Sequence, residues 1–94
     1  MPRVSVVMPA YQAAWCVGAA ASSVLWQTYD DLELVVVDDG STDGTADVAE
    51  ALPGPVRVLR QENAGVGAAR NRGIEAATGE LLSLIHISEP TRRS

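Results

Sequence analysis

Two carboxylates, Asp38 and Asp39, stand side by side after an apolar run and before the small polar loop "GSTDG". Such a pair could hold a metal ion, act as acid and base, bind a ligand or start a turn. Side chains alternate in extended chain, so we expect one acid to face a ligand and the other to stabilise the turn. Mg²⁺ usually binds one or two carboxylates plus substrate phosphates, and Ser41 breaks the calcium-loop pattern. We therefore favour Asp39 as an acceptor for an imide or ribose hydroxyl.

Two further groups carry side chains suited to ligand binding. Pro9, Ala10 and Tyr11 follow a short apolar run, and the ring of Tyr11 could lie against a planar base or simply pack at the end of a strand. Arg70 and Asn71 lie in a helical pattern, where Arg70 and Arg72 point in different directions because they are two residues apart. One arginine could reach a phosphate or a base while the other is solvated.

The elements that position these groups alternate along the chain. Residues 4–9, 33–39 and 56–61 are short β-branched or apolar runs typical of strands, the first ended by Pro9. Residues 13–28, 45–52 and 64–78 have helical character, with Ser41 or Thr42 as the expected N-cap of the second helix and Gly79 as the C-cap of the third. This order predicts an α/β fold, a Rossmann-like layered parallel sheet with flanking helices. Ligands of such sheets bind beyond the carboxyl ends of the strands, where all three groups lie.

Composition narrows the function. The chain has 94 residues, enough for one domain or part of one, and a net charge of -5 with no lysine, which argues against nucleic acid as a partner. Cys16 is the only cysteine, so no intramolecular disulfide can form, and we expect it to be a small apolar helix residue. A reducing compartment fits this composition best, so we expect a cytoplasmic protein. The apolar run at the start of the chain is too short to span a membrane. A membrane anchor would have to lie beyond this fragment. We expect Trp15 and Trp26 to pack on a helix, and Asp43 and Asp47 to lie in the first turn of the second helix.

Taken together, "VSVVMPAYQ", "SVLWQTYDDLELVVVDDGSTDGT" and "ENAGVGAARNRGIEAATGE" resemble the opening of a family 2 glycosyltransferase with the GT-A fold. The resemblance covers Arg3 to about Leu81 and departs at Gln12, where the family usually carries Asn. It implies transfer of a sugar from a nucleotide diphosphate sugar to an unknown acceptor. By position it assigns the nucleotide to the following residues: Pro9, Ala10 and Tyr11 as a wall, Asp39 on the base, Asp38 and Ser41 as support for their loop, and Arg70 and Asn71 beside the base or diphosphate.

The end of the chain departs from this family. The pattern next requires a strand ending in Asp-x-Asp, which carries a divalent cation, Mg²⁺ or Mn²⁺, on the donor diphosphate. Here the sequence reads "LLSLIHISEPTRRS", and Leu82 to Arg92 resembles the translated read-through of a sequencing adapter. We therefore expect residues 1–81 to be a partial GT-A nucleotide-binding half and residues 82–94 a non-native tail, in which "SLIHIS" could still form a strand. Without the metal motif and the catalytic base, which the family places later, we expect no transferase activity from this fragment.

Other functions remain to be weighed against this one. A non-catalytic nucleotide-binding or scaffold domain is the main alternative, and the gene sequence after Leu81 would distinguish the two. A phosphoacceptor receiver is disfavoured because its acids would follow the first strand, which here ends in "MPAY". A dinucleotide oxidoreductase is disfavoured because "GVGAAR" lacks the last glycine of the fingerprint and follows the third strand.

Overall fold

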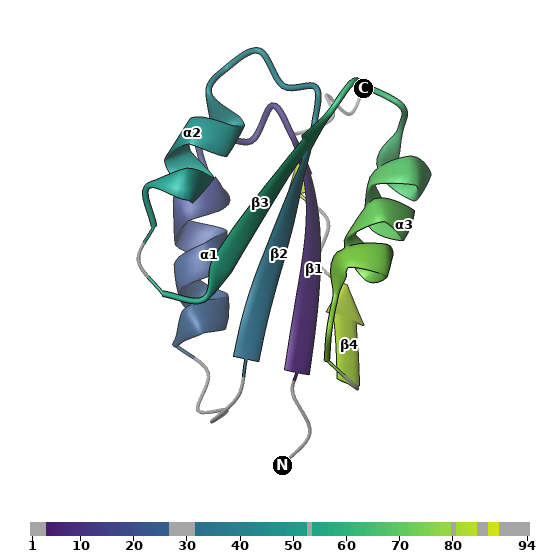
Figure 1. The fold of residues 1–94 in the computed structure, drawn as a ribbon. Helices are drawn as coiled ribbons and strands as arrows, with labels where there is room; N and C mark the ends of the chain where they lie inside the picture. The colour runs from purple at the N-terminus through teal and green to yellow at the C-terminus, as the bar shows by residue number, and fades with distance from the viewer. Residues whose placement is uncertain (1–3, 27–31, 53, 80, 85–86, 89–94) are drawn as a thin grey trace, which may run out of the picture.

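The fold is an alternation of strands and helices (Figure 1). A computed structural model of the chain describes residues 4–26, 32–52, 54–79, 81–84 and 87–88. The elements, in chain order, are β1 (Val4–Tyr11), α1 (Val17–Leu25), β2 (Leu32–Asp39), α2 (Thr45–Glu50), β3 (Val56–Gln61), α3 (Val66–Ala76), β4 (Leu81–Leu84) and β5 (Ile87–Ser88). The predicted order of three strand–helix pairs is confirmed.

All pairings in the sheet are parallel. Its order is β3-β2-β1-β4, and β5 also pairs with β1. The register places Ala10 opposite Asp38 and Asp39 opposite Gln61. The carboxyl ends of β1, β2 and β3 therefore lie level with one another, and the loops that follow them meet at one edge of the sheet.

Helices cover both faces of the sheet. In Figure 1, α1 and α2 lie on one face and α3 on the other. One core cluster joins α1 and α2 to the sheet and includes Met8, Val17 and Leu34, whereas Val35, Val37 and Ala69 form the cluster under α3. Every residue of β1 except Tyr11, and every residue of β2 except Leu32, is buried. The expectation from the uninterrupted apolar runs, strands covered on both faces, is confirmed.

The ends of the strands differ from prediction at one point. Pro9 does not end β1, which continues to Tyr11 with Pro9 paired to Val37. Among the described residues, pairing from β4 stops at Val7 and resumes from β5 at Ala10. Pro9 lies in the interval between these two pairings, where its lack of a backbone N–H costs no hydrogen bond to β4 or β5.

The helix ends also differ. Neither Ser41 nor Thr42 caps α2, because its N-cap is Gly44 at φ 85°, and only Asp47 of the two predicted acids lies in its first turn. Helix α3 ends at Ala76, with Ala77 in extended conformation as its C-cap in place of Gly79. The polar side chains expected to serve as caps instead join neighbouring loops, as described below.

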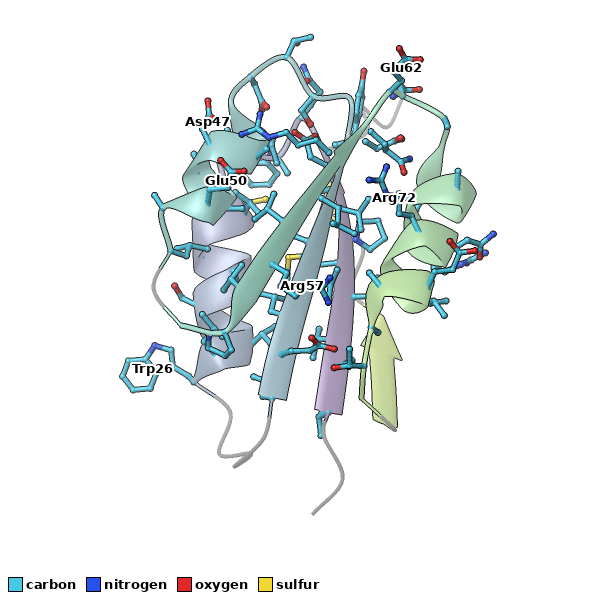
Figure 2. All side chains as sticks on the ribbon, in the orientation of Figure 1. Trp26, Asp47, Glu50, Arg57, Glu62 and Arg72 are labelled. Carbon is cyan, nitrogen blue, oxygen red and sulfur yellow. The ribbon has the colours of Figure 1, made fainter. Side chains whose placement is uncertain are left out.

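The two tryptophans are exposed, so the prediction that they pack on a helix is wrong. Trp15 precedes α1 and is 64% exposed, and Trp26 follows α1 and is 84% exposed. The buried side of α1 is occupied by Val17, Ala21 and Val24. Figure 2 shows Trp26 projecting away from the molecule at the end of the helix. No helix in the described ranges combines the length and apolar character that crossing a membrane requires.

Candidate functional site

The loops after β1 and β2 are joined by hydrogen bonds. Gln12 donates its backbone N–H to Ser41 Oγ over 2.8 Å, and its Oε1 accepts from the backbone N–H of Thr42 over 2.6 Å. Ala13 donates its backbone N–H to Thr45 Oγ1 over 2.9 Å. These five residues form what we call the loop junction. Because Ser41, Thr42 and Thr45 make these hydrogen bonds, the loop between β2 and α2 is held against the end of β1.

Asp43 adds a carboxylate to the same junction. Its oxygens accept backbone N–H groups from Ala14 and Thr45, each over 3.1 Å, as well as the Thr45 hydroxyl. Partial desolvation raises the pKa of Asp43, but the hydrogen bonds from Thr45 and Ala14 lower it by more, so it lies below its ordinary value. The folded state therefore favours the ionised form of this side chain.

Asp38 supports the turn. Its carboxylate is buried, and Oδ1 accepts the backbone N–H of Ser41 over 3.0 Å. Gly40 follows at φ 80°, and a Cβ on this residue would lie 2.6 Å from the backbone nitrogen of Asn63. The turn therefore needs glycine for its backbone angle and also for the close approach of the loop after β3.

The side chain of Asp39 points toward the loop after β3. Its Oδ1 accepts from Gln61 Nε2 over 2.8 Å and from the backbone N–H of Ala64 over 2.9 Å, and its Oδ2 accepts the backbone N–H of Gly65 over 3.0 Å. Its backbone oxygen accepts from Asn63 Nδ2 over 3.1 Å. Since Gly65 is the N-cap of α3, the carboxylate sits at the positive end of that helix. The two adjacent acids thus bind different loops, as the alternation of side chains predicts.

A pocket of about 240 Å³ opens where these loops meet. It lies between the end of β1, the end of β2 and the start of α3, and Asp39 is the acid in its wall. Tyr11, the last residue of β1, is 37% exposed, so its ring can be reached by a ligand. The lining residues are Pro9, Ala10, Tyr11, Asp39, Asn63, Gly65, Val66 and Ala69.

The other predicted site residues do not line this pocket. Asp38 and Ser41 hold the loop beside it, and Arg70 and Asn71 are exposed on α3. The Arg70 guanidinium Nη2 lies 4.0 Å from the place where a Cβ on Gly67 would be. Arg70 therefore runs back toward the amino end of α3, the end that borders the pocket.

Four lining residues were not predicted: Asn63, Gly65, Val66 and Ala69. Gln61 and Ala64, which bind Asp39, were not predicted either. The rule that directed attention to the ends of the first two strands applies equally to "QENAG" after the third. In that stretch the sequence showed polar and glycine residues in a loop but gave no sign that they turn toward Asp39.

A divalent cation does not fit the described residues. Among them, no group of three or more His, Cys, Asp or Glu side chains is placed to hold a metal ion. Asp38 and Asp39 each bind backbone N–H groups of neighbouring loops. We therefore assign no step to a metal held by this pair.

Known proteins are similar to this chain in sequence. Glycosyltransferase GlyG of Streptococcus pneumoniae is 40% identical over 86 residues, which are 87% of this chain and 29% of GlyG. The uncharacterized glycosyltransferase YibD of Escherichia coli is 40% identical over 87 residues, 88% of this chain and 25% of YibD. The chain thus spans about a quarter of the length of such curated relatives.

Solved structures agree with the fold. The mannosyltransferase PcManGT of Pyrobaculum calidifontis, in complex with GDP-Man and Mn²⁺, superposes with a TM-score of 0.78 at 36% identity, covering 86% of this chain and 26% of that one. TarS 1-349 of S. aureus gives a TM-score of 0.83 at 29% identity, covering 89% and 27%. The fold is that of GT-A glycosyltransferases. Residues 5–86 match the family described as Glycosyl transferase family 2, and the chain therefore belongs to that family.

Proposed function

We propose that this chain is the nucleotide-binding part of an enzyme that transfers a sugar from a nucleoside diphosphate sugar to an acceptor. The observation that carries the proposal is the pocket at the carboxyl edge of the sheet, where Tyr11 and Asp39 face the same space. PcManGT, whose fold is similar, is a mannosyltransferase in complex with GDP-Man. An aromatic ring beside a carboxylate suits a nucleoside base, which needs a stacking surface and an acceptor for its N–H.

The proposed roles follow from position. Pro9, Ala10 and Tyr11 form the wall against which the nucleoside lies, and Asp39 accepts a hydrogen bond from the base. Asp38 and Ser41 keep the loop between β2 and α2 in place. Arg70 reaches toward the amino end of α3 and, with Asn71, would lie beside the base or diphosphate, where a guanidinium neutralises phosphate charge.

We further propose that the full-length enzyme uses Mg²⁺ or Mn²⁺, bound by residues outside this fragment. PcManGT contains Mn²⁺ in its complex, and a cation on the donor diphosphate would stabilise the leaving group. The printed sequence contains no Asp-x-Asp. We therefore expect the 94-residue chain alone to bind nucleotide without transferring sugar. We propose a cytoplasmic location because the single cysteine, Cys16, cannot form an intramolecular disulfide, which fits a reducing compartment.

Binding of nucleoside diphosphates to the chain and its variants tests the proposal. We expect Tyr11→Ala and Asp39→Ala each to weaken binding about tenfold, because each removes a base contact worth roughly 1.4 kcal/mol. Trp26→Ala is the matched control, since it removes an aromatic side chain that is 84% exposed and outside the pocket. Isothermal titration calorimetry on folded variants supplies the affinities. If Tyr11→Ala and Asp39→Ala bind as tightly as Trp26→Ala, the proposed site is wrong.

The alternative is a nucleotide-binding or scaffold domain that catalyses nothing, and it turns on the native sequence after Leu81. We propose that residues 82–94 are non-native. A strand at β4 does not decide this, because any alternating apolar segment can pair with the open side of β1. Resequencing the source DNA with long reads made without transposase adapters gives the answer. A frame that continues into a strand and Asp-x-Asp supports the transferase, whereas an encoded tail followed by a stop supports the binding domain.

A further inference from the structure

We propose that the outer face of α1 is a self-association surface, on which a second copy of this chain packs antiparallel to form a two-fold dimer. The surface consists of what we call the outer stripe, four residues on the side of α1 that faces away from the sheet: Trp15, Ala19, Ser22 and Trp26. The inference concerns association between copies, so it does not rest on the nucleotide site proposed above.

Helix geometry places the four residues of the outer stripe on one side. They follow one another at intervals of four, three and four, the spacing that aligns side chains along a helix. Backbone hydrogen bonds continue the winding at both ends, because Val17 donates to the oxygen of Ala13 over 2.7 Å and Trp26 donates to that of Ser22 over 3.0 Å. The residues that α1 buries lie roughly half a turn away. They are Val17, Ala21 and Val24.

The outer stripe lacks the charges that the solvated side of a helix normally carries. Trp15 is 64% exposed and Trp26 is 84% exposed, the latter projecting from the end of α1 in Figure 2. Residues 4–29 contain no Asp, Glu, Lys, Arg or His, although a fifth of the whole chain is charged. A helix without a charged side is normally buried on all sides. Two exposed indoles on such a face therefore indicate that a partner covers it.

The order of residues in the outer stripe fits a second copy of itself. Trp15 is four residues from Ala19, and Ser22 is four residues from Trp26, so the stripe has large side chains at both ends and small ones in the middle. In an antiparallel pair with the two-fold axis at the centre of the stripe, Trp15 of each copy meets Trp26 of the other. Ala19 then meets Ser22. A two-fold interface requires this self-complementarity, whereas a bilayer or an unrelated partner does not.

The sizes of these side chains suit two crossed helices. Such helices are closest where they cross, and their separation grows toward their ends. Ala19 and Ser22 lie at the crossing point, where small side chains let the two backbones approach closely. Each indole lies about 8 Å along the helix from that point, where it fills the widening space and packs against the indole of the other copy.

Area and charge set the strength of the dimer. The two indoles expose roughly 350 Å² in each copy, since a tryptophan presents up to about 250 Å². With the helix surface between them, two copies would bury about 1,000 Å² in all, the low end for specific interfaces. Each copy also carries a net charge of -5, so the copies repel each other at low salt. We expect a reversible dimer with a Kd of about 10–100 μM that tightens as salt is added.

Intrinsic fluorescence tests this surface directly, because Trp15 and Trp26 are the only two tryptophans in the chain. As the wild-type chain is concentrated from about 1 to 500 μM, we expect its emission maximum to shift to shorter wavelength and acrylamide quenching to fall. Sedimentation equilibrium over the same range should record monomer and dimer and no larger species, because a two-fold interface closes on itself.

Ala19→Leu separates close helix packing from non-specific hydrophobic association. The larger side chain holds the helices apart at the crossing point, so the Kd of the dimer should rise about tenfold or more although the surface becomes more apolar. Trp26→Ser should weaken the dimer as well. Ile74→Ala is the control, because it shortens an apolar side chain that is 38% exposed on α3, across the sheet, and should keep the wild-type Kd.

Three results would overturn the inference. The first is a chain that stays monomeric at about 500 μM. The second is self-association that leaves the tryptophan emission unchanged or that Ala19→Leu leaves unchanged or strengthens, which would indicate pairing through another surface or non-specific association. The third is a shift in emission on phosphatidylcholine vesicles without self-association in solution, which would assign the outer stripe to a bilayer. Each result leaves the nucleotide site standing, because none of these measurements involves a nucleotide.

Discussion

At the scale of single residues, Gln12 links backbone strain to the shape of the site. It is the non-glycine residue with positive φ, 51°, among the described residues, and its Oε1 accepts the backbone N–H of Thr42. Asn adopts this left-handed conformation more readily than most residues do. Asn at this position would therefore meet the backbone angle with less strain, whereas the longer Gln side chain reaches across to the neighbouring loop.

Replacement of Gln12 by Ala and by Gly separates the strain from the hydrogen bond. Both variants lose the contact from Oε1 to Thr42, but only glycine adopts positive φ without steric cost. We expect Gln12→Ala to be less stable than Gln12→Gly by about 1 kcal/mol, and both to be less stable than wild type. Urea denaturation measures the differences. An alanine variant as stable as the glycine variant would show that the backbone is not strained there.

The hydrogen bonds to the Asp43 carboxylate predict that the stability of the fold depends on pH. Its folded pKa lies below its ordinary value, so the stability it contributes is present above the unfolded pKa and is lost as pH falls through the folded pKa. Asp43→Asn removes that contribution at neutral pH. The thermal midpoints of wild type and variant should therefore differ most near pH 7 and converge below about pH 4. A difference that stays constant down to pH 3 would contradict the assignment.

At the scale of elements, glycine decides how closely α3 approaches the sheet. A Cβ at Gly73 would lie 2.2 Å from Val7 Cγ1 and 3.2 Å from Val37 Cγ2. The helix therefore packs on β1 and β2 at a distance that only glycine permits. Since Val66 and Ala69 of the same helix line the pocket, this distance also fixes the width of the site.

Two substitutions in α3 test this packing against helix propensity. Gly73→Ala should destabilise the chain by about 1–3 kcal/mol, because the helix must move away from the two valines. Gly67→Ala should stabilise it by up to about 1 kcal/mol, since the nearest atom is the mobile end of Arg70, 4.0 Å away. Chemical denaturation gives both values. Equal shifts of the same sign would mean that propensity, and not close packing, governs this helix.

Arginines attach β3 to helices on both faces of the sheet. Arg60 Nη2 lies 2.9 Å from Asp47 Oδ1 and 2.8 Å from Glu50 Oε1, and Figure 2 shows both acids on α2 beside β3. Arg57 donates from its side chain to the backbone oxygen of Ala76, over 2.8 Å, at the end of α3. Exposed ion pairs contribute little to stability. Charged side chains on the outer strand do, however, discourage pairing with another chain.

At the scale of the whole molecule, Glu33 joins segments that are far apart in sequence. It is buried at the end of β2 opposite the pocket, and its Oε2 accepts from Ser5 Oγ and from the backbone N–H of Thr78, each over 2.6 Å. Ser5 Oγ in turn accepts the backbone N–H of Gly79 over 2.7 Å. β1, β2 and the segment after α3 therefore meet at one carboxylate.

Replacement of Glu33 tests whether these segments stabilise the fold together. Glu33→Ala leaves the buried Ser5 hydroxyl and the backbone N–H of Thr78 without their acceptor and should cost roughly 2 kcal/mol. Glu33→Gln retains one acceptor oxygen and should cost less, and the exposed Glu62→Ala should cost almost nothing. Urea denaturation followed by far-ultraviolet circular dichroism measures all three, because both tryptophans are already exposed in the folded chain. If Glu33→Ala unfolds at the wild-type urea concentration, the carboxylate does not hold these segments together.

By itself the sequence determined the order of the elements, the parallel sheet and the edge at which the site forms. Uninterrupted apolar runs at β1 and β2 can only be buried between two layers, and the carboxyl ends of parallel strands necessarily face the same way. Pro9, Ala10, Tyr11 and Asp39 were placed on that basis, and the structure gathers them around one pocket.

Only the tertiary structure decided which side chains from separate loops meet. The hydrogen bonds from Gln61, Ala64 and Gly65 to Asp39 span 22 to 26 residues, and local patterns carry no information about contacts of that range. The same reason explains why Ser41 and Thr42 join the loop junction when their local pattern predicted a helix cap. Residue type and spacing fix local preferences, whereas the competition between local and distant hydrogen-bond partners is settled only when the chain folds.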